Sequence, residues 1–367
     1  MSRILVTGAL GQIGSWLVPA LRSGYGPDAV LATDLRTPGE RPDSSVRASK
    51  PRSAREEGPF RRVDATDPAA LAEAVRDHRA DTVYHLAAIL SAVGEENPTR
   101  TWAVNMGSLE AVLEIARRQG CALFVPSSIA VFGPDSPGDP APQNGPMRPT
   151  SIYGVTKLAG ELLCDYYHLR YGLDVRGLRY PGLVSYGAPP GGGTTDWSVE
   201  MFDYAVRGRP YPSFLHPDTR LDIMYMPDAV RAAMELMEAD GTLLRHRNSY
   251  NVTAMQLSPG LLAKEIRKHI RGFTVSHDPD PVRQAIADSW PDRLDDRAAR
   301  ADWGWRHEFD LGSMTRDMVD HNRRERAVDA DASRAGDEPR SDRSPSQIAS
   351  RSDRARKEPA APAAAGV

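Results

Sequence analysis

The sequence predicts an α/β fold with a doubly wound parallel sheet, and three observations lead to this prediction. In the first half of the 367-residue chain, short apolar runs alternate with segments of helical spacing. A glycine-rich turn joins the first apolar run to the first helical segment. Hydrophobic residues make up 40% of the chain, which is enough for a large core. Strands that are separated by helices lie parallel in one sheet, so βαβ units are the expected building blocks.

Apolar runs mark six predicted strands. The first is Ile4–Thr7, a short run that ends at Gly8 and is typical of a buried parallel strand. The spacing of apolar residues also predicts helices between the strands, on both faces of the sheet. The other strands are expected at residues 29–34, 60–64, 82–86, 121–127 and 175–180, and the helices at residues 12–22, 68–78 and 98–119.

Composition excludes several classes of protein. The formal net charge of −3 argues against a dedicated nucleic-acid binder. No apolar run approaches the ~20 residues that span a bilayer, and the N-terminal segment does not resemble a signal peptide. The two cysteines, Cys121 and Cys164, suit neither a disulfide framework nor a metal site. We therefore expect a cytoplasmic protein that binds no metal, membrane or nucleic acid.

The glycine-rich turn has the context of a dinucleotide-binding site. Gly8, Gly11 and Gly14 follow a strand and precede a helix, so the backbone can approach a pyrophosphate at the helix N-terminus. Asp34 ends the second strand, where a carboxylate can bind the adenosine ribose hydroxyls and repel a 2′-phosphate. Arg36 is the opposing feature, because an arginine can accommodate that phosphate. The pattern predicts a Rossmann-type domain that prefers NAD to NADP.

Tyr153 and Lys157 are candidates for general base catalysis. They are four residues apart on a helix that begins near Ser151, so they share one face. A nearby ammonium group and the positive nicotinamide ring are expected to favour the phenolate and to lower its pKa from ~10. Ser127 and Ser128 end the fifth predicted strand, and one of these two hydroxyls should face the cofactor. The strand alternation leaves open which serine this is.

A loop at residues 188–196 combines three glycines with two threonines and a carboxylate. Asp196 can meet a substrate ammonium group, and Thr194 or Thr195 can bind a carboxylate or a hydroxyl. The alternative interpretation is that Asp196 only caps the helix that begins near Trp197.

These motifs resemble the extended short-chain dehydrogenase/reductase superfamily. The Gly-x-x-Gly-x-x-Gly spacing of residues 8–14 and the small residues of 85–88 match its pattern. Asp64 stands where this superfamily places an acid beside the adenine, and residues 180–183 resemble its nicotinamide-contacting segment. The superfamily pattern Ser-x-x-x-x-Gly selects Ser128 as the catalytic serine.

Within this superfamily, residues 1 to about 320 are similar to the NAD-dependent L-threonine 3-dehydrogenases of the short-chain type, which are close to UDP-galactose 4-epimerase. Two positions depart from the pattern. Leu221-Asp222 replaces an apolar-Pro pair, and Gly187 stands where a lysine is frequent. The matching segments include LAAILSAVG (86–94), YGVTKLAGELL (153–163), GLRYPGL (177–183), GGGTTDW (191–197), YMPDA (225–229) and RQAIADSWP (283–291).

The resemblance implies the residues of each site. The catalytic set is Ser128, Tyr153 and Lys157. The substrate set is Ser91, Ser128, Tyr153, Thr194, Thr195, Asp196 and Trp290. The cofactor set is Gly8, Gly11, Gln12, Ile13, Gly14, Asp34, Leu35, Arg36, Asp64, Leu86, Ala87, Ala88, Asn105, Tyr153, Lys157, Tyr180, Pro181 and Leu183.

The implied activity is oxidation of L-threonine at C3 by NAD, a step of threonine catabolism that yields 2-amino-3-oxobutyrate. The alternative is an NAD-dependent UDP-sugar 4-epimerase. It would need basic side chains on the pyrophosphate, and Arg220 and Arg231 are the candidates for this role. A homodimer is expected, because this superfamily pairs the helices near residues 98–119 and 151–171 across an interface.

The chain is expected to have three parts. Residues 1–180 form mainly the NAD-binding domain and carry a polar surface loop at 37–58. Residues 181–322 form mainly a smaller α/β domain for the substrate. Residues 323–367 are predicted to be a disordered tail, because they are polar and contain no aromatic residue.

Overall fold

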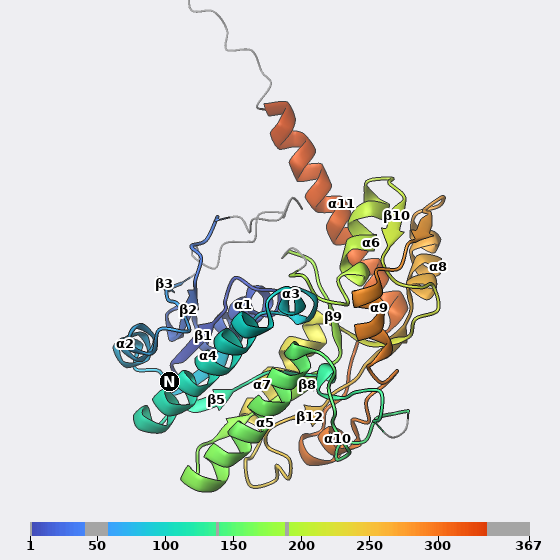
Figure 1. Ribbon diagram of the computed structural model, residues 1–367. Helices are drawn as coiled ribbons and strands as arrows, with labels where there is room; N and C mark the ends of the chain where they lie inside the picture. Colours follow the sequence, from blue (N-terminus) through green and yellow to red (C-terminus); the bar gives the residue numbers. More distant parts are fainter. Residues whose placement is uncertain (1, 41–57, 137–138, 188–190, 336–367) are drawn as a thin grey trace, which may run out of the picture. The chain divides into compact units, whose positions relative to one another are not determined.

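A computed structural model describes residues 2–40, 58–136, 139–187 and 191–335 (Figure 1). Most of the predicted loop at 37–58 lies outside the described residues. Residues 1–326 form one compact unit, and a second unit begins at Ala327.

The first unit is built on a six-stranded sheet with the strand order β3-β2-β1-β4-β5-β7. All neighbouring strands pair in parallel, which confirms the predicted fold class. The order reverses between β1 and β4, and ligands of such sheets bind at this switch point. The strands are β1 (Ile4–Thr7), β2 (Val30–Asp34), β3 (Phe60–Arg62), β4 (Thr82–His85), β5 (Ala122–Phe124) and β7 (Val175–Arg176).

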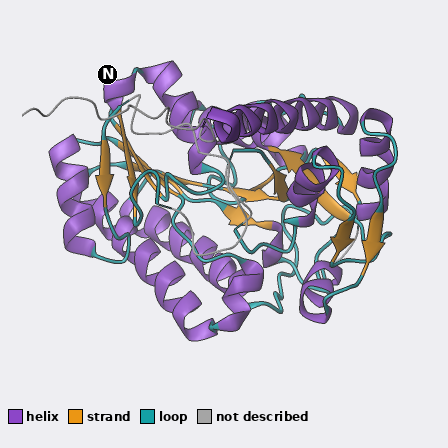
Figure 2. Ribbon diagram, turned by 90° about the horizontal axis from the view of Figure 1, so that it is seen from above, coloured by secondary structure: helices purple, strands orange, loops and turns teal. Residues whose placement is uncertain are grey.

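Helices cover both faces of this sheet (Figure 2). Alternate residues of β1 divide between two cores, because successive side chains point to opposite faces. Ile4 and Val6 pack into the core that contains α1 and α7, and Leu5 packs into the core that contains α2, α4 and α5. The helices are α1 (Gly14–Tyr25), α2 (Pro68–His78), α3 (Ser91–Glu96), α4 (Pro98–Gln119), α5 (Ile152–Tyr171) and α7 (Met226–Glu238).

Local sequence signals fix the ends of the helices. Asp67 caps α2 by accepting hydrogen bonds from two backbone N–H groups, and Asn97 and Ser151 cap α4 and α5 by accepting one each. Gly120 and Gly172 end α4 and α5 in the left-handed conformation that favours glycine. The predicted bounds of α2 and α4 are therefore confirmed.

Two predicted strands were wrong in extent. The expected strand at 121–127 ends at Phe124, and Ser127–Ser128 form a separate short strand, β6. The expected strand at 175–180 breaks at Gly177 into β7 and β8 (Leu178–Tyr180). Gly177 lies against the backbone oxygen of Val125, where a Cβ atom would come within 2.5 Å. After this break, β8 pairs with β6 and with β12 (Tyr250–Asn251) instead of the central sheet.

Other element ends differ by a few residues. A 3-10 turn at Pro27–Ala29 delays the second strand to Val30, the third strand ends at Arg62, and the first helix runs from Gly14 to Tyr25.

The C-terminal half adds a smaller α/β part with its own core. Its three-stranded sheet has the order β13-β11-β9, and β10 pairs with β14. Trp197, Phe202 and Tyr211 are among the buried residues of this core. The further elements are β9 (Gly182–Val184), α6 (Trp197–Val206), β10 (Tyr211–Ser213), β11 (Leu221–Tyr225), β13 (Met255–Leu257), α8 (Pro259–His269), β14 (Val275–His277), α9 (Pro281–Asp288), α10 (Arg297–Trp303) and α11 (Leu311–Ala335).

The predicted start of the disordered tail at residue 323 was wrong, because α11 continues to Ala335. Apolar residues of its first turns, Met314, Met318 and Val319, are buried in the C-terminal core and anchor the helix. Residues 336–367 lie outside the described residues.

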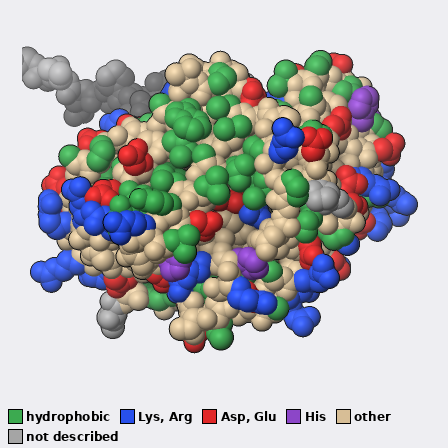
Figure 3. All heavy atoms as spheres, turned by 60° about the horizontal axis from the view of Figure 1, so that its bottom comes forward, with side chains coloured by type: hydrophobic (Ala, Val, Ile, Leu, Met, Phe, Trp, Pro, Cys, Tyr) green, Lys and Arg blue, Asp and Glu red, His purple; other side chains and the backbone are tan. Residues whose placement is uncertain are grey.

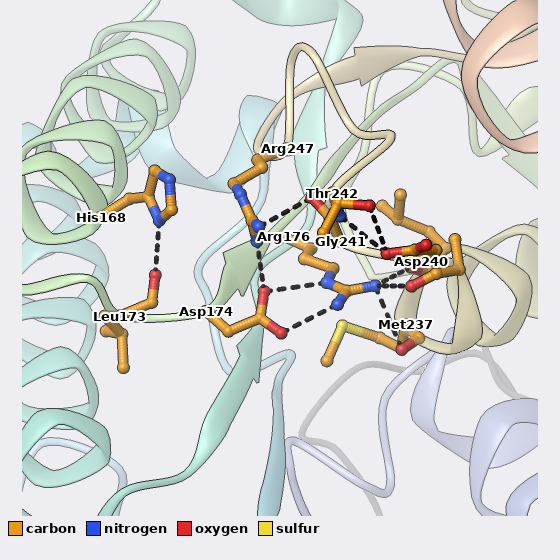
Figure 4. Close-up of polar contacts among 11 residues, drawn as sticks. His168, Leu173, Asp174, Arg176, Met237, Asp240, Gly241, Thr242 and Arg247 are labelled. Carbon is orange, nitrogen blue, oxygen red and sulfur yellow. Dashed lines mark hydrogen bonds and ion pairs between the residues drawn. The ribbon is translucent and has the colours of Figure 1, made fainter.

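The edge strand β7 is tied to the end of α7 by Arg176, as Figure 4 shows. The buried guanidinium binds both oxygens of Asp174 at 2.9 Å. Its third nitrogen donates to the backbone oxygens of Leu236, Met237 and Ala239 at the C-terminus of α7. The cation therefore satisfies carbonyl groups that the helix end leaves without partners.

Candidate active site

A cavity of about 460 Å³ lies at the carboxyl ends of β1 and β4 and extends to the C-terminal part. It joins segments that are far apart in the sequence. Its lining includes Gly8, Leu10–Gly14, Arg36, Leu86, Ala88–Ser91, Val93, Pro126–Ile129, Tyr153, Lys157, Tyr180–Leu183, Gly191, Gly193–Asp196 and Trp290.

The glycine turn at the floor of this cavity has no room for side chains. Gly8 has a φ angle of +65°, and a Cβ atom there would lie 2.9 Å from the backbone nitrogen of Ala87. A Cβ atom on Gly14 would lie 2.5 Å from the oxygen of Gly8. The bare backbone leads into the N-terminus of α1, as a bound pyrophosphate requires. These residues therefore fit a dinucleotide cofactor.

Asp34 lies at the end of β2, beside the glycine turn. Its buried carboxylate accepts hydrogen bonds from the backbone N–H groups of Leu10 and Arg36, each at 3.0 Å. The Nε atom of Arg36 lies 3.3 Å from the same carboxylate, and Arg36 lines the cavity. Asp34 is expected to repel the 2′-phosphate of NADP and Arg36 to accommodate it, yet the two side chains bind each other.

Several predicted cofactor residues lie outside the cavity lining. Asp64 is exposed, and its carboxylate binds the N–H and hydroxyl groups of Thr66 in a local turn. Leu35 is 55% exposed. The side chain of Asn105 holds the backbone N–H and oxygen of Ile89, at 2.8 and 3.1 Å, so it positions a residue that lines the cavity.

The candidate catalytic side chains come together at the start of α5. The Nζ atom of Lys157 donates to the backbone oxygen of Pro126 at 2.8 Å and lies 5.6 Å from the centre of the Tyr153 ring. Tyr153 and Ser128 are joined by a hydrogen bond. All three side chains line the cavity beside the glycine turn.

Burial shifts the pKa values of this pair in opposite directions. Loss of solvent raises the pKa of Tyr153 to about 12, although its hydrogen bond with Ser128 favours the phenolate. Loss of solvent lowers the pKa of Lys157 to about 8. In the chain without cofactor, desolvation therefore outweighs the neighbouring groups, and the lowering of the Tyr153 pKa beside a bound nicotinamide ring stays a prediction.

The structure distinguishes the two strand-end serines. Ser127 donates to the carboxylate of Glu161 at 2.5 Å, and Glu161 forms a buried, two-pronged ion pair with Arg179. Ser128 faces Tyr153 instead. The hydroxyl of Ser127 is thus already bonded to the Glu161 side of the Glu161–Arg179 ion pair. Ser128, which the superfamily pattern selects, is the serine that faces Tyr153.

The loop at residues 191–196 also contributes to the cavity lining. The hydroxyls of Ser91 and Thr194 are hydrogen-bonded at 3.1 Å, and Thr195 also lines the cavity. The Oδ2 atom of Asp196 accepts the backbone N–H groups of Gly192 and Gly193, at 2.8 and 2.9 Å. Burial raises the pKa of Asp196 to about 7.

The alternative interpretation of Asp196 as a helix cap was wrong in one respect. Asp196 precedes α6 in the sequence, but its side chain makes no capping hydrogen bond to that helix. The carboxylate instead points to the glycine loop, where it accepts the N–H groups of Gly192 and Gly193.

Apolar lining residues escaped the sequence analysis. Ile89, Leu90, Val93 and Ile129 line the cavity next to predicted site residues. They carry no chemical signal of their own, and the available signal was their position one to three residues from Ala88, Ser91 and Ser128. Within the described ranges, no group of three metal-ligating side chains is suitably placed, and no helix has the length and apolarity to cross a membrane.

Comparison with known proteins places this geometry in a family. The model of the NAD dependent epimerase/dehydratase family matches residues 4–253. The chain belongs to this family. An uncharacterized epimerase/dehydratase of Staphylococcus saprophyticus is 48% identical over 320 residues, which cover 87% of this chain and 97% of the relative.

Solved structures agree with the predicted resemblance. A partial consensus L-threonine 3-dehydrogenase is 46% identical and has a TM-score of 0.82. The match covers 88% of the present chain and 99% of the consensus protein. The L-threonine dehydrogenase of Clostridium difficile is 45% identical, with a TM-score of 0.82 over 89% and 99% of the two chains. A monomeric L-threonine 3-dehydrogenase from a metagenome is 45% identical, with a TM-score of 0.80 over 88% and 99%.

The UDP-glucose 4-epimerase of Thermotoga maritima shares only the fold, at 23% identity and a TM-score of 0.72 over 88% and 99% of the chains. Arg231, one of the two candidates for binding the pyrophosphate of a UDP-sugar, is outside the described cavity lining. Arg231 is instead bound to Asp228 and Glu235 and lies over the ring of Trp305. Arg220 is also outside this lining.

Proposed function

We propose that this family member is an NAD-dependent L-threonine 3-dehydrogenase that converts L-threonine to 2-amino-3-oxobutyrate. The observation that carries the proposal is that two sets of side chains line one cavity. The first set is Ser128, Tyr153 and Lys157, and the second is Asp196 and Thr194. A hydroxyl group and an ammonium group on neighbouring carbons of one small substrate match these two chemistries.

Each residue has a distinct part in the proposed reaction. Ser128 orients the substrate hydroxyl, and Tyr153 takes its proton. The charge of Lys157 stabilises the phenolate form of Tyr153. Asp196 attracts the substrate ammonium, and Ser91, Thr194 and Thr195 offer hydrogen bonds to the carboxylate, while Trp290 forms the wall. Bound NAD supplies the acceptor for the hydride from C3.

The direct test is formation of NADH by purified protein that is offered L-threonine, L-serine and UDP-sugars in separate assays. We expect L-threonine to be oxidised best, because loss of one methyl contact is worth ~1–3 kcal/mol. Epimerisation of a UDP-sugar without oxidation of L-threonine would instead support the epimerase alternative.

We expect a preference for NAD over NADP that depends on Asp34. Asp34→Ala removes the carboxylate and frees Arg36, so the preference should narrow by about tenfold or more. The ratio of kcat/KM values for the two cofactors measures this effect. Glu73→Ala, which removes an exposed acid of α2 outside the described cavity lining, is the control and should leave the ratio unchanged. Comparable use of NADP by the unmutated protein would show that Arg36 dominates.

We expect Asp196 to bind the substrate ammonium in its ionised form. The raised pKa means that the carboxyl group gains a proton as the pH falls through about 7, so the KM for L-threonine should rise below that pH. Asp196→Asn should raise the KM about tenfold at pH 8 and remove this pH dependence, while NAD binding persists. An unchanged KM in Asp196→Asn would assign Asp196 to the loop alone.

A homodimer is proposed from exposed apolar side chains on α4 and α5. Hydrophobic side chains gather on the face that Figure 3 views. Leu162 and Leu169 of α5 are 62% and 84% exposed, and Trp102, Val155, Tyr166 and Tyr171 are also exposed. Light scattering at micromolar concentration should give twice the chain mass of 40.2 kDa, and Leu162→Lys/Leu169→Lys should give a monomer. A monomer without these substitutions would contradict the proposal.

A cytoplasmic location is proposed as well. Cys121 and Cys164 are both buried free thiols, a form that a reducing compartment maintains.

A further inference from the structure

Asp222 is a buried carboxylate outside the cavity lining, at the second position of β11. It is 1% exposed. Its Oδ1 atom accepts the hydroxyl of Thr253 at 2.7 Å, and its Oδ2 atom accepts the backbone N–H of Leu294 at 2.8 Å. Both donors are neutral groups, so neither bond forms an ion pair. Burial of a carboxylate in this way is unfavourable, and burial raises its pKa to about 7.

The bond to Leu294 holds a wall of the cavity. Leu294 follows Trp290, which lines the cavity, and packs into a small core together with it. Ile129 belongs to the same core and directly follows the candidate catalytic Ser128. The position of Leu294 therefore determines how Trp290 packs beside the Ser128 turn.

The backbone of β11 connects Asp222 to a second wall. In the register of this sheet, Ile223 pairs with Gly182 and Met224 pairs with Leu183. Gly182 and Leu183 line the cavity. Asp222 thus connects β11, which pairs with the cavity-lining strand β9, to the segment that carries Trp290. Leu221-Asp222 replaces the apolar-Pro pair expected from the resemblance, and a proline offers no side-chain acceptor. The hydrogen bond to Leu294 therefore depends on this replacement.

We propose that Asp222 is a positioning residue for the part of the cavity that Trp290 lines. Its carboxylate fixes the segment 290–296 through the N–H of Leu294. The consequence for L-threonine rests on the proposed function, whereas the consequence for the segment itself does not.

The test compares Asp222→Leu with Asp222→Asn in the full-length protein. An asparagine can accept the N–H of Leu294 and donate to Thr253, whereas a leucine leaves that N–H without a partner. Hydrogen exchange measured by mass spectrometry on a peptide that covers residues 290–296 reports the bond directly. We expect exchange there to become at least about tenfold faster in Asp222→Leu and to stay near the unmutated rate in Asp222→Asn.

The kinetic arm measures KM and kcat for L-threonine, together with the Kd for NAD. We expect Asp222→Leu to raise the KM about tenfold, with smaller changes in kcat and in the Kd for NAD. Asp228→Leu is the matched control, because Asp228 is also 1% exposed and accepts the N–H groups of Glu308 and Phe309 away from this wall. It should lower the melting temperature without raising the KM.

Two results would overturn the proposal: unchanged exchange of residues 290–296 in Asp222→Leu, or faster exchange there without any rise in KM. If Asp222→Leu does not fold, Asp222→Ala, which removes the carboxylate without adding bulk, is measured in its place. Absence of NADH formation from L-threonine by the unmutated protein would refute the proposed function, and the exchange comparison would still decide whether Asp222 holds the segment.

Discussion

Tyr153→Phe should lower kcat for L-threonine oxidation by about 10²–10⁴-fold, the contribution typical of a positioned general base. The substitution removes the phenol hydroxyl beside Ser128 and leaves the ring in place. Because burial keeps the Tyr153 hydroxyl protonated at neutral pH, kcat of the unmutated enzyme should also rise with pH as this hydroxyl loses its proton. Steady-state kinetics from pH 7 to 10 check both effects.

The design separates chemistry from binding. The Kd for NAD, from titration of the protein with the cofactor, should change little in Tyr153→Phe, because the glycine turn is untouched. Tyr167→Phe removes a hydroxyl from the same helix away from the described cavity lining and should leave kcat unchanged. If Tyr153→Phe kept most of its turnover, the proposed mechanism would be wrong.

Glu161→Ala should destabilise the fold by about 3–5 kcal/mol. Glu161 and Arg179 are 5% and 6% exposed, and two hydrogen bonds of 2.9 and 2.7 Å join them. Removal of the carboxylate leaves the guanidinium charge buried and also frees the hydroxyl of Ser127. The loss should appear as a lower denaturant midpoint in urea unfolding, with an unchanged slope.

The matched control is an exposed pair of the same chemistry. Arg61 and Asp77 are joined at 3.0 Å, but their side chains are 39% and 43% exposed. Water screens this pair, so Asp77→Ala should change the free energy of unfolding by less than about 1 kcal/mol. Equal losses in Glu161→Ala and Asp77→Ala would show that burial does not strengthen the first pair.

Local signals explain why part of the fold was predictable. The bounds of α2 and α4 follow from Asp67, Asn97 and Gly120, which act through backbone groups a few residues away. The strand at 175–180 was not predictable in this way. Its break at Gly177 depends on the backbone oxygen of Val125 and on the loop near Arg247, which hydrogen-bond geometry brings together from distant parts of the chain.

The sequence by itself determined the parallel sheet, the glycine turn and the Tyr153/Lys157 pair, because these features depend on periodicity and on spacing within one element. The choice of Ser128 over Ser127 came from the superfamily resemblance. Only the tertiary structure decided the partner of Ser127, the direction of the Asp196 carboxylate and the link from Asp222 to Leu294. Each of these depends on which distant groups share a buried space, because desolvation makes hydrogen bonds there obligatory and sets the pKa values of the acids.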